Sequence, residues 1–227
     1  MRVHVAFTPA ETVRAPVAVV VDVLRATSTI AQALASGYRR VFCCAEIEEA
    51  RELRDRLGEG VLAGERLALA IPGFDLGNSP AEFVEPRGET VVLTTTNGTR
   101  AIVAAAANAE IVLVGSLLNL TAVVEAAREA GAPIEVVCAG VDGRFTLDDA
   151  YCAGRFAELL GDDRSDAAEA AVRLARSFAS AEEALQAAEN PRQEALGEDL
   201  AWCARESVLA VAPRLARLDG SAAEIVA

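Results

Sequence analysis

The fold is decided by residues 19–30, which read VVVDVLRATSTI. Apolar residues run into Asp22, a small polar cluster follows, and an alanine-rich segment comes next. In an α/β protein this order places Asp22 at the carboxyl end of a buried parallel strand. Thr27 and Ser28 would then begin a helix, where free backbone N–H groups favour an anion. With Arg25 between them, these residues predict the centre of an active site; the simpler alternative is that Asp22 only caps a turn.

Strand-like and helix-like segments alternate along the chain on both sides of this stretch. Apolar, β-branched runs predict strands at 3–7, 17–21, 41–44, 61–63, 90–94, 111–114 and 134–137. Amphipathic helices are expected between them, for example at 46–57 and 120–130. The alternation predicts an α/β fold, a three-layer α/β/α sandwich with a mostly parallel, mixed sheet. Residues 1–227 are expected to form a single domain, largely helical from about 162, with a break at Asn190-Pro191.

Charge and hydropathy exclude several classes of partner. The net charge of −13 argues against nucleic-acid binding, which needs a basic face. No uncharged apolar run reaches the roughly 20 residues that a membrane span needs. The N-terminus lacks the apolar core of a signal peptide, so we expect a cytoplasmic protein that does not contact a membrane. A homo-oligomer is compatible with the sequence.

Missing residue types restrict the chemistry. All 21 basic residues are arginines, which excludes Schiff-base catalysis and any mechanism built on a phosphate-loop lysine. The single histidine, His4, lies in the first predicted strand, which argues against a Ser-His-Asp triad or a histidine-rich zinc site. The five cysteines form no C-x-x-C pair and indicate neither a disulfide framework nor structural zinc.

Polar residues gather where the predicted strands end. Acidic side chains follow several strands, among them Asp22, Glu65 and the Asp148-Asp149 pair, as an oxygen-ligated Mg²⁺ site requires. Arginines accompany them and offer two-pronged grips on a phosphate. Ligands bind outside the carboxyl ends of parallel strands. Metal-assisted phosphoryl chemistry is therefore the reaction that this set of residues could best perform.

A second motif competes with this interpretation. Cys138 and Arg144 match the C-x5-R pattern of cysteine-dependent phosphatases, in which a thiolate attacks phosphorus and an arginine holds the oxygens. Against it, Asp142 places a negative charge inside the loop that would bind phosphate. Phe145 also stands where a hydroxyl group would assist the leaving thiolate.

Five motifs together resemble those of the 2-phosphosulfolactate phosphatases in order and spacing. They are DVLRATSTI at 22–30, GER at 64–66, GFDLGNSP at 73–80, TTNGTR at 95–100 and CAG at 138–140. The resemblance covers about residues 3–161, and Asp148-Asp149 departs from the Glu-Asp expected in that family. It implies an Mg²⁺-dependent phosphatase that converts (2R)-O-phospho-3-sulfolactate to 3-sulfolactate and phosphate, a step in coenzyme M biosynthesis. A related phosphorylated hydroxy acid is the alternative substrate.

The residues and the resemblance together assign the expected site, whose partner is a small anionic phosphomonoester. Catalytic roles are expected for Asp22, Arg25 and Glu65, and metal ligation for Asp22, Glu65, Asp148 and Asp149. Expected substrate-binding residues are Arg66, Thr27, Ser28, Asn78, Ser79, Thr96, Asn97, Gly98, Ser116 and Arg144.

Two further alternatives concern mechanism and function. We favour attack by water over attack by Asp22, because an aspartyl-phosphate signature needs a second acid where Leu24 stands, and a lysine, which the chain lacks. The non-enzymatic alternative is a module that binds a phosphorylated or sulfonated metabolite without turnover.

Overall fold

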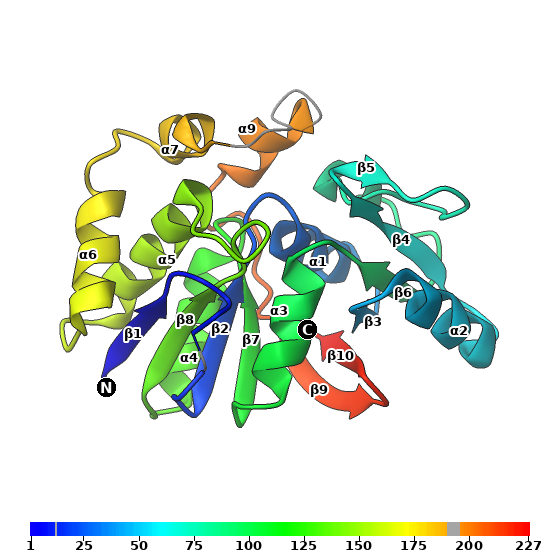
Figure 1. The fold of residues 1–227 in the computed structure, drawn as a ribbon, viewed down its shortest axis with the longest axis horizontal. Coiled ribbons are helices and arrows are strands. Elements are labelled where there is room, and N and C mark those ends of the chain that lie inside the picture. Colours follow the sequence, from blue (N-terminus) through cyan, green and yellow to red (C-terminus); the bar gives the residue numbers. More distant parts are fainter. Residues whose placement is uncertain (12, 190–195) are drawn as a thin grey trace.

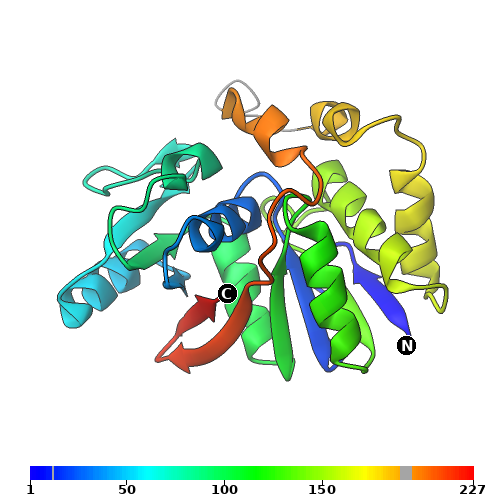
Figure 2. The same ribbon diagram turned by 180° about the vertical axis from the view of Figure 1, so that it is seen from behind.

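A mixed β-sheet runs through the molecule, with helices on both sides (Figures 1 and 2). The computed structural model describes residues 1–11, 13–189 and 196–227. Within these residues the sheet has ten strands in the order β1-β8-β2-β7-β9-β10-β3-β6-β4-β5. This arrangement confirms the predicted three-layer α/β/α fold with a mostly parallel sheet.

The parallel strands form two groups. The first contains β1 (Val3–Ala6), β8 (Ile134–Cys138), β2 (Val17–Val21) and β7 (Ile111–Gly115). The second contains β3 (Arg40–Cys44), β6 (Thr90–Thr94) and β4 (Val61–Arg66). Strand β2 is central in its group and pairs in parallel with β7 and β8, so its carboxyl end is flanked by theirs. The predicted strands therefore occur where their apolar runs indicated.

A C-terminal hairpin joins the two groups. Strand β9 (Arg214–Asp219) turns into β10 (Ala222–Val226), which pairs antiparallel with β3. Strand β9 pairs antiparallel with β7 at one position, Leu113 with Arg214. The sequence analysis did not predict these strands and expected a largely helical C-terminal part. It also missed the short strand β5 (Leu69–Ala70), which pairs with β4 inside the long loop.

The helices follow the strands in alternation. In the first two-thirds of the chain they are α1 (Ala26–Ala35), α2 (Ile47–Leu57), the 3₁₀ helix η1 (Pro80–Phe83), α3 (Gly98–Ala106), α4 (Leu120–Glu129) and α5 (Leu147–Leu160). Further along they are α6 (Asp166–Ala175), α7 (Ala181–Ala187) and α9 (Asp199–Cys203). The predicted break at Asn190-Pro191 lies outside the described residues. No helix in the described part of the chain is long and apolar enough to cross a membrane.

The core has two sides because successive strand residues point to opposite faces. On one face Val19 packs in a cluster with Val123 of α4 and Phe156 of α5. On the other face Val20 belongs to a cluster with Ile102 of α3. Accordingly, α3 lies in front of the sheet in Figure 1 and α4 in front of it in Figure 2. Helices α7 and α9 lie beyond the carboxyl ends of the central strands, above the predicted site (Figure 1).

Candidate active site

The turn after β2 is shaped by its own side chains. Asp22 follows the strand, and its N–H donates to Oγ1 of Thr27 over 3.1 Å. The Thr27 hydroxyl in turn donates to the Asp22 carbonyl over 2.9 Å, and the Ser28 hydroxyl donates to the Val23 carbonyl over 2.8 Å. Both hydroxyl side chains are fully buried. Thr27 and Ser28 thus hold the turn that presents Asp22, and the structure does not bring them into the cavity described next.

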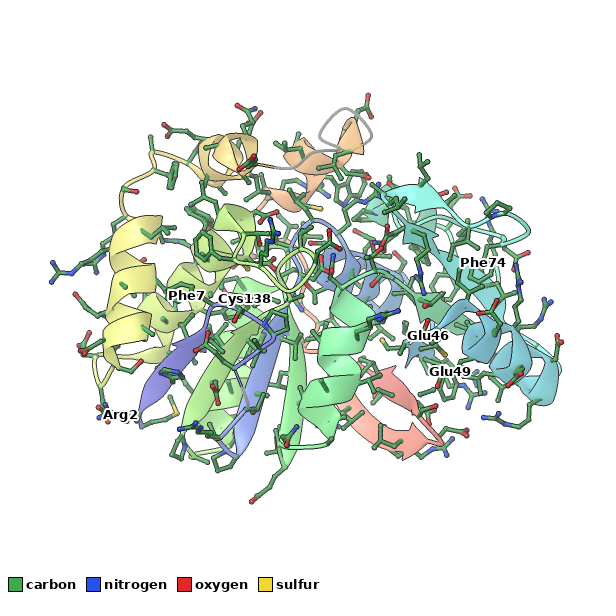
Figure 3. All side chains as sticks on the ribbon, viewed as in Figure 1. Arg2, Phe7, Glu46, Glu49, Phe74 and Cys138 are labelled. Atoms are coloured by element: carbon green, nitrogen blue, oxygen red, sulfur yellow. The ribbon has the colours of Figure 1, made fainter. Side chains whose placement is uncertain are left out.

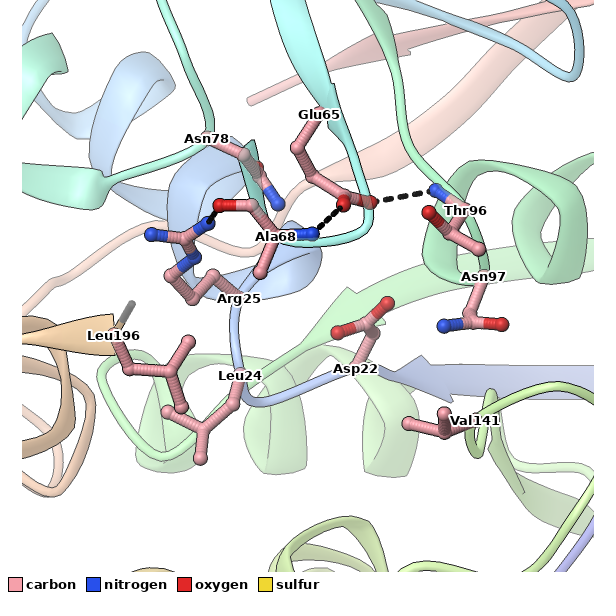
Figure 4. Close-up of a pocket in the computed structure, with 10 residues that line it drawn as sticks. All are labelled: Asp22, Leu24, Arg25, Glu65, Ala68, Asn78, Thr96, Asn97, Val141 and Leu196. Atoms are coloured by element: carbon pink, nitrogen blue, oxygen red, sulfur yellow. Dashed lines mark hydrogen bonds between the residues drawn. The ribbon is translucent and has the colours of Figure 1, made fainter. Parts of the chain in front are cut away.

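A small cavity opens at this end of the sheet (Figure 4). Its volume is about 50 Å³, room for little more than one group of a ligand. It contains six of the predicted site residues, namely Asp22, Arg25, Glu65, Asn78, Thr96 and Asn97. The other lining residues are Leu24, Ala68, Val141 and Leu196. Two of the four predicted acids, one of the three predicted arginines and both predicted amides therefore meet near the carboxyl ends of β2, β4 and β6.

Glu65 is fixed at the end of β4 by backbone donors from two loops. The N–H of Ala68 donates to one carboxylate oxygen and the N–H of Thr96 to the other, both over 2.7 Å (Figure 4). The side chain is 8% exposed. Two such bonds stabilise a carboxylate and set its direction. Glu65 is therefore presented to the cavity with little freedom to turn.

Asp22 is buried in the cavity wall, and its pKa is raised. Burial raises its pKa to about 7, the Ala26 N–H lowers it, and the nearby carboxyls of Glu65 and Asp148 raise it. A buried aspartate that is surrounded by other acids ionises readily only when a cation lies close. Within the described residues, one Asp22 oxygen accepts the Ala26 N–H over 3.3 Å and the other accepts no hydrogen bond.

Gly98 allows α3 to approach Asp22. A Cβ atom at Gly98 would lie 2.4 Å from Oδ2 of Asp22 and 2.5 Å from Cβ of Ala26. Neither distance is tolerable for a real side chain. The predicted substrate-binding Gly98 therefore leaves room for the Asp22 carboxylate at the start of α3.

Arg25 is the one arginine that lines the cavity among the described residues. Its guanidinium donates to Asp199 over 2.6 Å and to the Ala68 carbonyl over 3.2 Å. The side chains of Arg25 and Asp199 are 8% and 9% exposed. These bonds use two of the five N–H donors of a guanidinium, so donors remain for an anion.

The two acids at the start of α5 have other partners. Asp149 accepts the N–H of Val23 and the N–H of Gly140, both over 2.9 Å, one on each carboxylate oxygen. Asp148 accepts the Asp149 N–H over 2.9 Å. Asp149 thus ties the turn after β2 to the turn after β8. The structure places neither acid among the residues that line the cavity.

Four other predicted residues also lie outside the cavity. Arg66 donates to the carbonyls of Ala45 and Glu65 and to the Thr94 hydroxyl. Ser116 is fully buried and donates to Asn119. Ser79 donates to Asp199 over 2.5 Å, and Arg144 is exposed beside a separate hollow of about 650 Å³. The side chains of Arg66, Ser116 and Ser79 thus have hydrogen-bond partners outside the cavity, and Arg144 lines the separate hollow.

Two buried polar atoms of the cavity wall lack a hydrogen-bond partner within the described residues. They are Oδ1 of Asn78 and Oγ1 of Thr96. Such atoms cost free energy unless a ligand, ion or water satisfies them. Both residues line the same cavity as Asp22 and Glu65. The unsatisfied atoms therefore indicate a polar ligand at this position.

The lining residues that sequence reasoning missed are mostly apolar. Leu24, Ala68 and Val141 lie in loops after strands, and Leu196 comes from the segment before α9. Leu24 and Val141 stood next to predicted residues, so proximity along the chain could have suggested them. Nothing in the sequence around Leu196 or Asp199 pointed to the cavity.

Known proteins resemble this chain along nearly its whole length. The family model described as 2-phosphosulpholactate phosphatase matches residues 4–217. The chain belongs to the 2-phosphosulfolactate phosphatase family. A protein of Methanothermobacter thermautotrophicus named 2-phosphosulfolactate phosphatase is 39% identical over 198 residues, or 86% of this chain and 84% of that protein. A Thermus thermophilus protein named probable 2-phosphosulfolactate phosphatase is 40% identical over 226 residues, covering 95% and 94%.

Membership of this family of phosphoric monoester hydrolases confirms the resemblance that five motifs indicated. The matched range extends beyond residue 161 to residue 217, and so includes α9 and most of β9. The C-terminal third, which the motifs did not cover, is therefore also part of the shared sequence.

The structure argues against the competing cysteine motif. Cys138, labelled in Figure 3, is the last residue of β8 and is fully buried. Burial, followed by the charge of Asp149, raises the pKa of its thiol well above the ordinary value. A nucleophilic cysteine needs the opposite, an accessible thiolate with a lowered pKa. Cys138 belongs to the apolar cluster under α5, and Arg144 lies on the exposed loop.

Proposed function

We propose that this protein is an Mg²⁺-dependent phosphatase that hydrolyses 2-phosphosulfolactate to 3-sulfolactate and phosphate. Membership of the family supports the reaction and the substrate. The observation that carries the proposal is the cavity in which Asp22, Glu65 and Arg25 meet. Two carboxylates in one small buried space repel each other, and a divalent cation would remove that repulsion.

The cavity wall fits Mg²⁺ in the type and number of its donors. Mg²⁺ prefers oxygen ligands and is often held by one or two carboxylates together with substrate phosphate and water. Asp22, Glu65 and the unpartnered amide oxygen of Asn78 supply such oxygens. Among the described residues no three acids, histidines or cysteines form a metal-binding group, so a dedicated all-protein cage is not what fits. When bound, Mg²⁺ would polarise the phosphoryl group and offset its charge.

The chain's own residues would orient the phosphoryl group. Arg25 reaches the cavity with free N–H donors and would bind phosphoryl oxygens as a planar fork. The Thr96 hydroxyl and the Asn97 amide face the same space and would donate to the anion. Apolar Leu24 and Leu196 close one side and limit the access of bulk water. We propose that water attacks phosphorus, and isolation of a peptide phosphorylated at Asp22 would contradict this.

The rest of the substrate would extend beyond this cavity. A volume of about 50 Å³ holds a phosphoryl group at most, whereas the substrate also carries a carboxylate and a sulfonate. Three larger hollows adjoin it, and two of them contain a further arginine. One shares Val141 and contains Arg144, and the other shares Thr96 and Asn97 and contains Arg100. These exposed arginines would bind the remaining anionic groups.

A phosphate-release screen tests the proposal. Purified protein is offered 2-phosphosulfolactate and a panel of other phosphomonoesters, with Mg²⁺ or with EDTA. We expect release that EDTA abolishes and Mg²⁺ restores, with 2-phosphosulfolactate preferred. Asp22→Asn should lower kcat by at least about a hundredfold and retain the fold, because a metal ligand and an ionic charge are lost. Cys138→Ser is the matched control and should keep the wild-type rate.

Three outcomes would contradict the proposal. Hydrolysis that persists in EDTA and disappears in Cys138→Ser would favour a thiol phosphatase. Binding of the phosphomonoester without turnover would favour a binding module. Wild-type kcat in Asp22→Asn would remove Asp22 from the reaction.

A further inference from the structure

Asp199 connects two loops of the site from a distant part of the chain. One of its carboxylate oxygens accepts Nη1 of Arg25 over 2.6 Å, and the other accepts the Ser79 hydroxyl over 2.5 Å. Asp199 begins α9, 174 residues after Arg25. Its side chain is 9% exposed. One oxygen of Asp199 therefore binds Arg25, which lines the cavity, and the other binds Ser79, which follows the lining residue Asn78.

Helix α9 holds the same turn at a second place. Cys203, four residues after Asp199, is fully buried; its thiol lies beside the Ser28 side chain, in the apolar cluster that also includes Val23. Residues four apart lie on the same face of a helix. One face of α9 thus contacts both Arg25 and Ser28 in the turn that presents Asp22. Figures 1 and 2 show α9 above the first turn of α1 from both sides.

The contact matters because a free arginine side chain has many conformations. Asp199 holds Nη1 and the Ala68 carbonyl holds Nη2, so two bonds define the plane of the Arg25 guanidinium. Arg25 lines the cavity, so its remaining donors are held in a set orientation beside that space. A catalytic group that is held in the direction of the reacting atom avoids the entropy cost of finding it. The geometry points to Asp199 as a positioning residue that orients Arg25 toward the phosphoryl group. This inference rests on the proposed phosphatase function.

This role has a kinetic signature that a purely structural ion pair lacks. Asp199 offsets the charge of Arg25, so its removal makes the cavity more positive and does not weaken attraction for an anion. It does release the guanidinium from its orientation. Asp199→Asn should therefore lower kcat about tenfold or more, while KM stays within about twofold of the wild-type value or falls.

The experiment measures kcat and KM for Mg²⁺-dependent phosphate release in four proteins: wild type, Asp199→Asn, Arg25→Lys and the double variant. Arg25→Lys keeps the charge but lacks the fork that Asp199 aligns. We expect Asp199→Asn to change kcat by less than about twofold in the Arg25→Lys protein. Glu198→Gln is the matched control: it removes an exposed charge one residue away and should keep wild-type kinetics.

The outcomes separate this inference from the proposed function. Equal losses of kcat in the wild-type and Arg25→Lys backgrounds, a loss confined to KM, or wild-type kinetics in Asp199→Asn would overturn the role of Asp199 and leave the phosphatase proposal intact. A wild-type protein without turnover would overturn both. If thermal unfolding shows that Asp199→Asn does not fold, Ser79→Ala replaces it, because it frees the other carboxylate oxygen. Ser79→Ala should then lower kcat by less than about tenfold in the wild-type background and leave it unchanged in the Arg25→Lys background. An unchanged kcat of Ser79→Ala in the wild-type background would overturn the inference.

Discussion

At the scale of single residues, the site contains acids whose ionised form is disfavoured by burial. Asp22 is buried beside Glu65 and Asp148, and its pKa rises to about 7. Asp149 is buried as well, and burial together with the charges of Asp148 and Asp22 also raises its pKa, but two backbone N–H groups bind its oxygens. Asp22 thus keeps one oxygen without a hydrogen bond among the described residues and lines the cavity, whereas Asp149 joins two turns and lies outside it. We therefore expect Asp22 to reduce the stability of the metal-free protein, because its position serves ligand binding.

Stability of the metal-free protein should depend on pH through Asp22. The group ionises near 3.8 in the unfolded chain and near 7 in the folded protein, so the folded state binds more protons between these values. Stability contributed by this group therefore falls as pH rises from about 4 to about 7. In EDTA, Asp22→Asn should be more stable than the wild type at pH 8 by on the order of 1–3 kcal/mol, and nearly equal at pH 4.

Chemical denaturation at the two pH values measures this difference. Asp162→Asn, which removes a fully exposed charge, serves as the control and should change stability little at either pH. A wild-type protein as stable as Asp22→Asn at pH 8 would show that Asp22 is not strained by burial.

Gly98 should be required for the position of Asp22. In Gly98→Ala the added methyl group would overlap the Asp22 carboxylate and the Ala26 side chain, so one of them must move. We expect kcat/KM to fall by about tenfold to a hundredfold, because displacements of about 1 Å in a site have costs of that size. Steady-state kinetics measure the loss. Gly88→Ala, where a Cβ meets only Val61 at 3.6 Å, should behave as the wild type.

At the scale of elements, the C-terminal hairpin holds the two parallel groups of strands together. Strand β10 is buried and pairs with β3, whereas β9 is largely exposed and pairs with β7 at one position. The site lies across this junction, since Asp22 follows β2 in one group and Glu65 ends β4 in the other. The hairpin is therefore the part of the sheet that links the group carrying Asp22 to the group carrying Glu65.

Packing of β10 should accordingly contribute to stability. Ile225 is fully buried and belongs to the cluster that includes α3 and β6. Ile225→Ala should reduce the free energy of unfolding by about 2–4 kcal/mol, the usual cost of a large-to-small change in a core. Leu218→Ala on β9 is the matched control, because its side chain is 45% exposed and should cost little. Urea denaturation measures both, and equal costs would contradict the role of β10 as the buried strand.

At the scale of the whole molecule, the protein carries a net charge of −13 and yet is proposed to bind a multiply charged anion. Long-range electrostatics repel an anion from a protein of this net charge. The electrostatic potential inside the cavity must therefore be more positive than that of the surface. Arg25 and a bound divalent cation would supply that difference. Binding of the cation should then stabilise the whole fold, because it interacts with the folded state alone.

Mg²⁺ should raise the unfolding temperature at pH 8. At a concentration of one hundred times Kd, mass action predicts a gain of about 2.7 kcal/mol. Asp22→Asn should lose most of this gain, while NaCl at equal ionic strength shows how much comes from screening of the surface charge. A thermal-shift measurement gives the result, and an identical Mg²⁺ effect in Asp22→Asn would place the cation elsewhere.

The pattern of residues along the chain predicted the α/β class, the strands of both parallel groups and the family. The same pattern placed Asp22, Arg25, Glu65, Thr96 and Asn97 at one edge of the sheet, and the family motif added Asn78. These follow from local patterns, since a buried strand and the polar residue at its end are adjacent in the chain. Only the tertiary structure decided which polar strand ends face the cavity. It turned Asp149 toward backbone N–H groups and brought Asp199 to Arg25, because side-chain partners depend on three-dimensional proximity between distant segments.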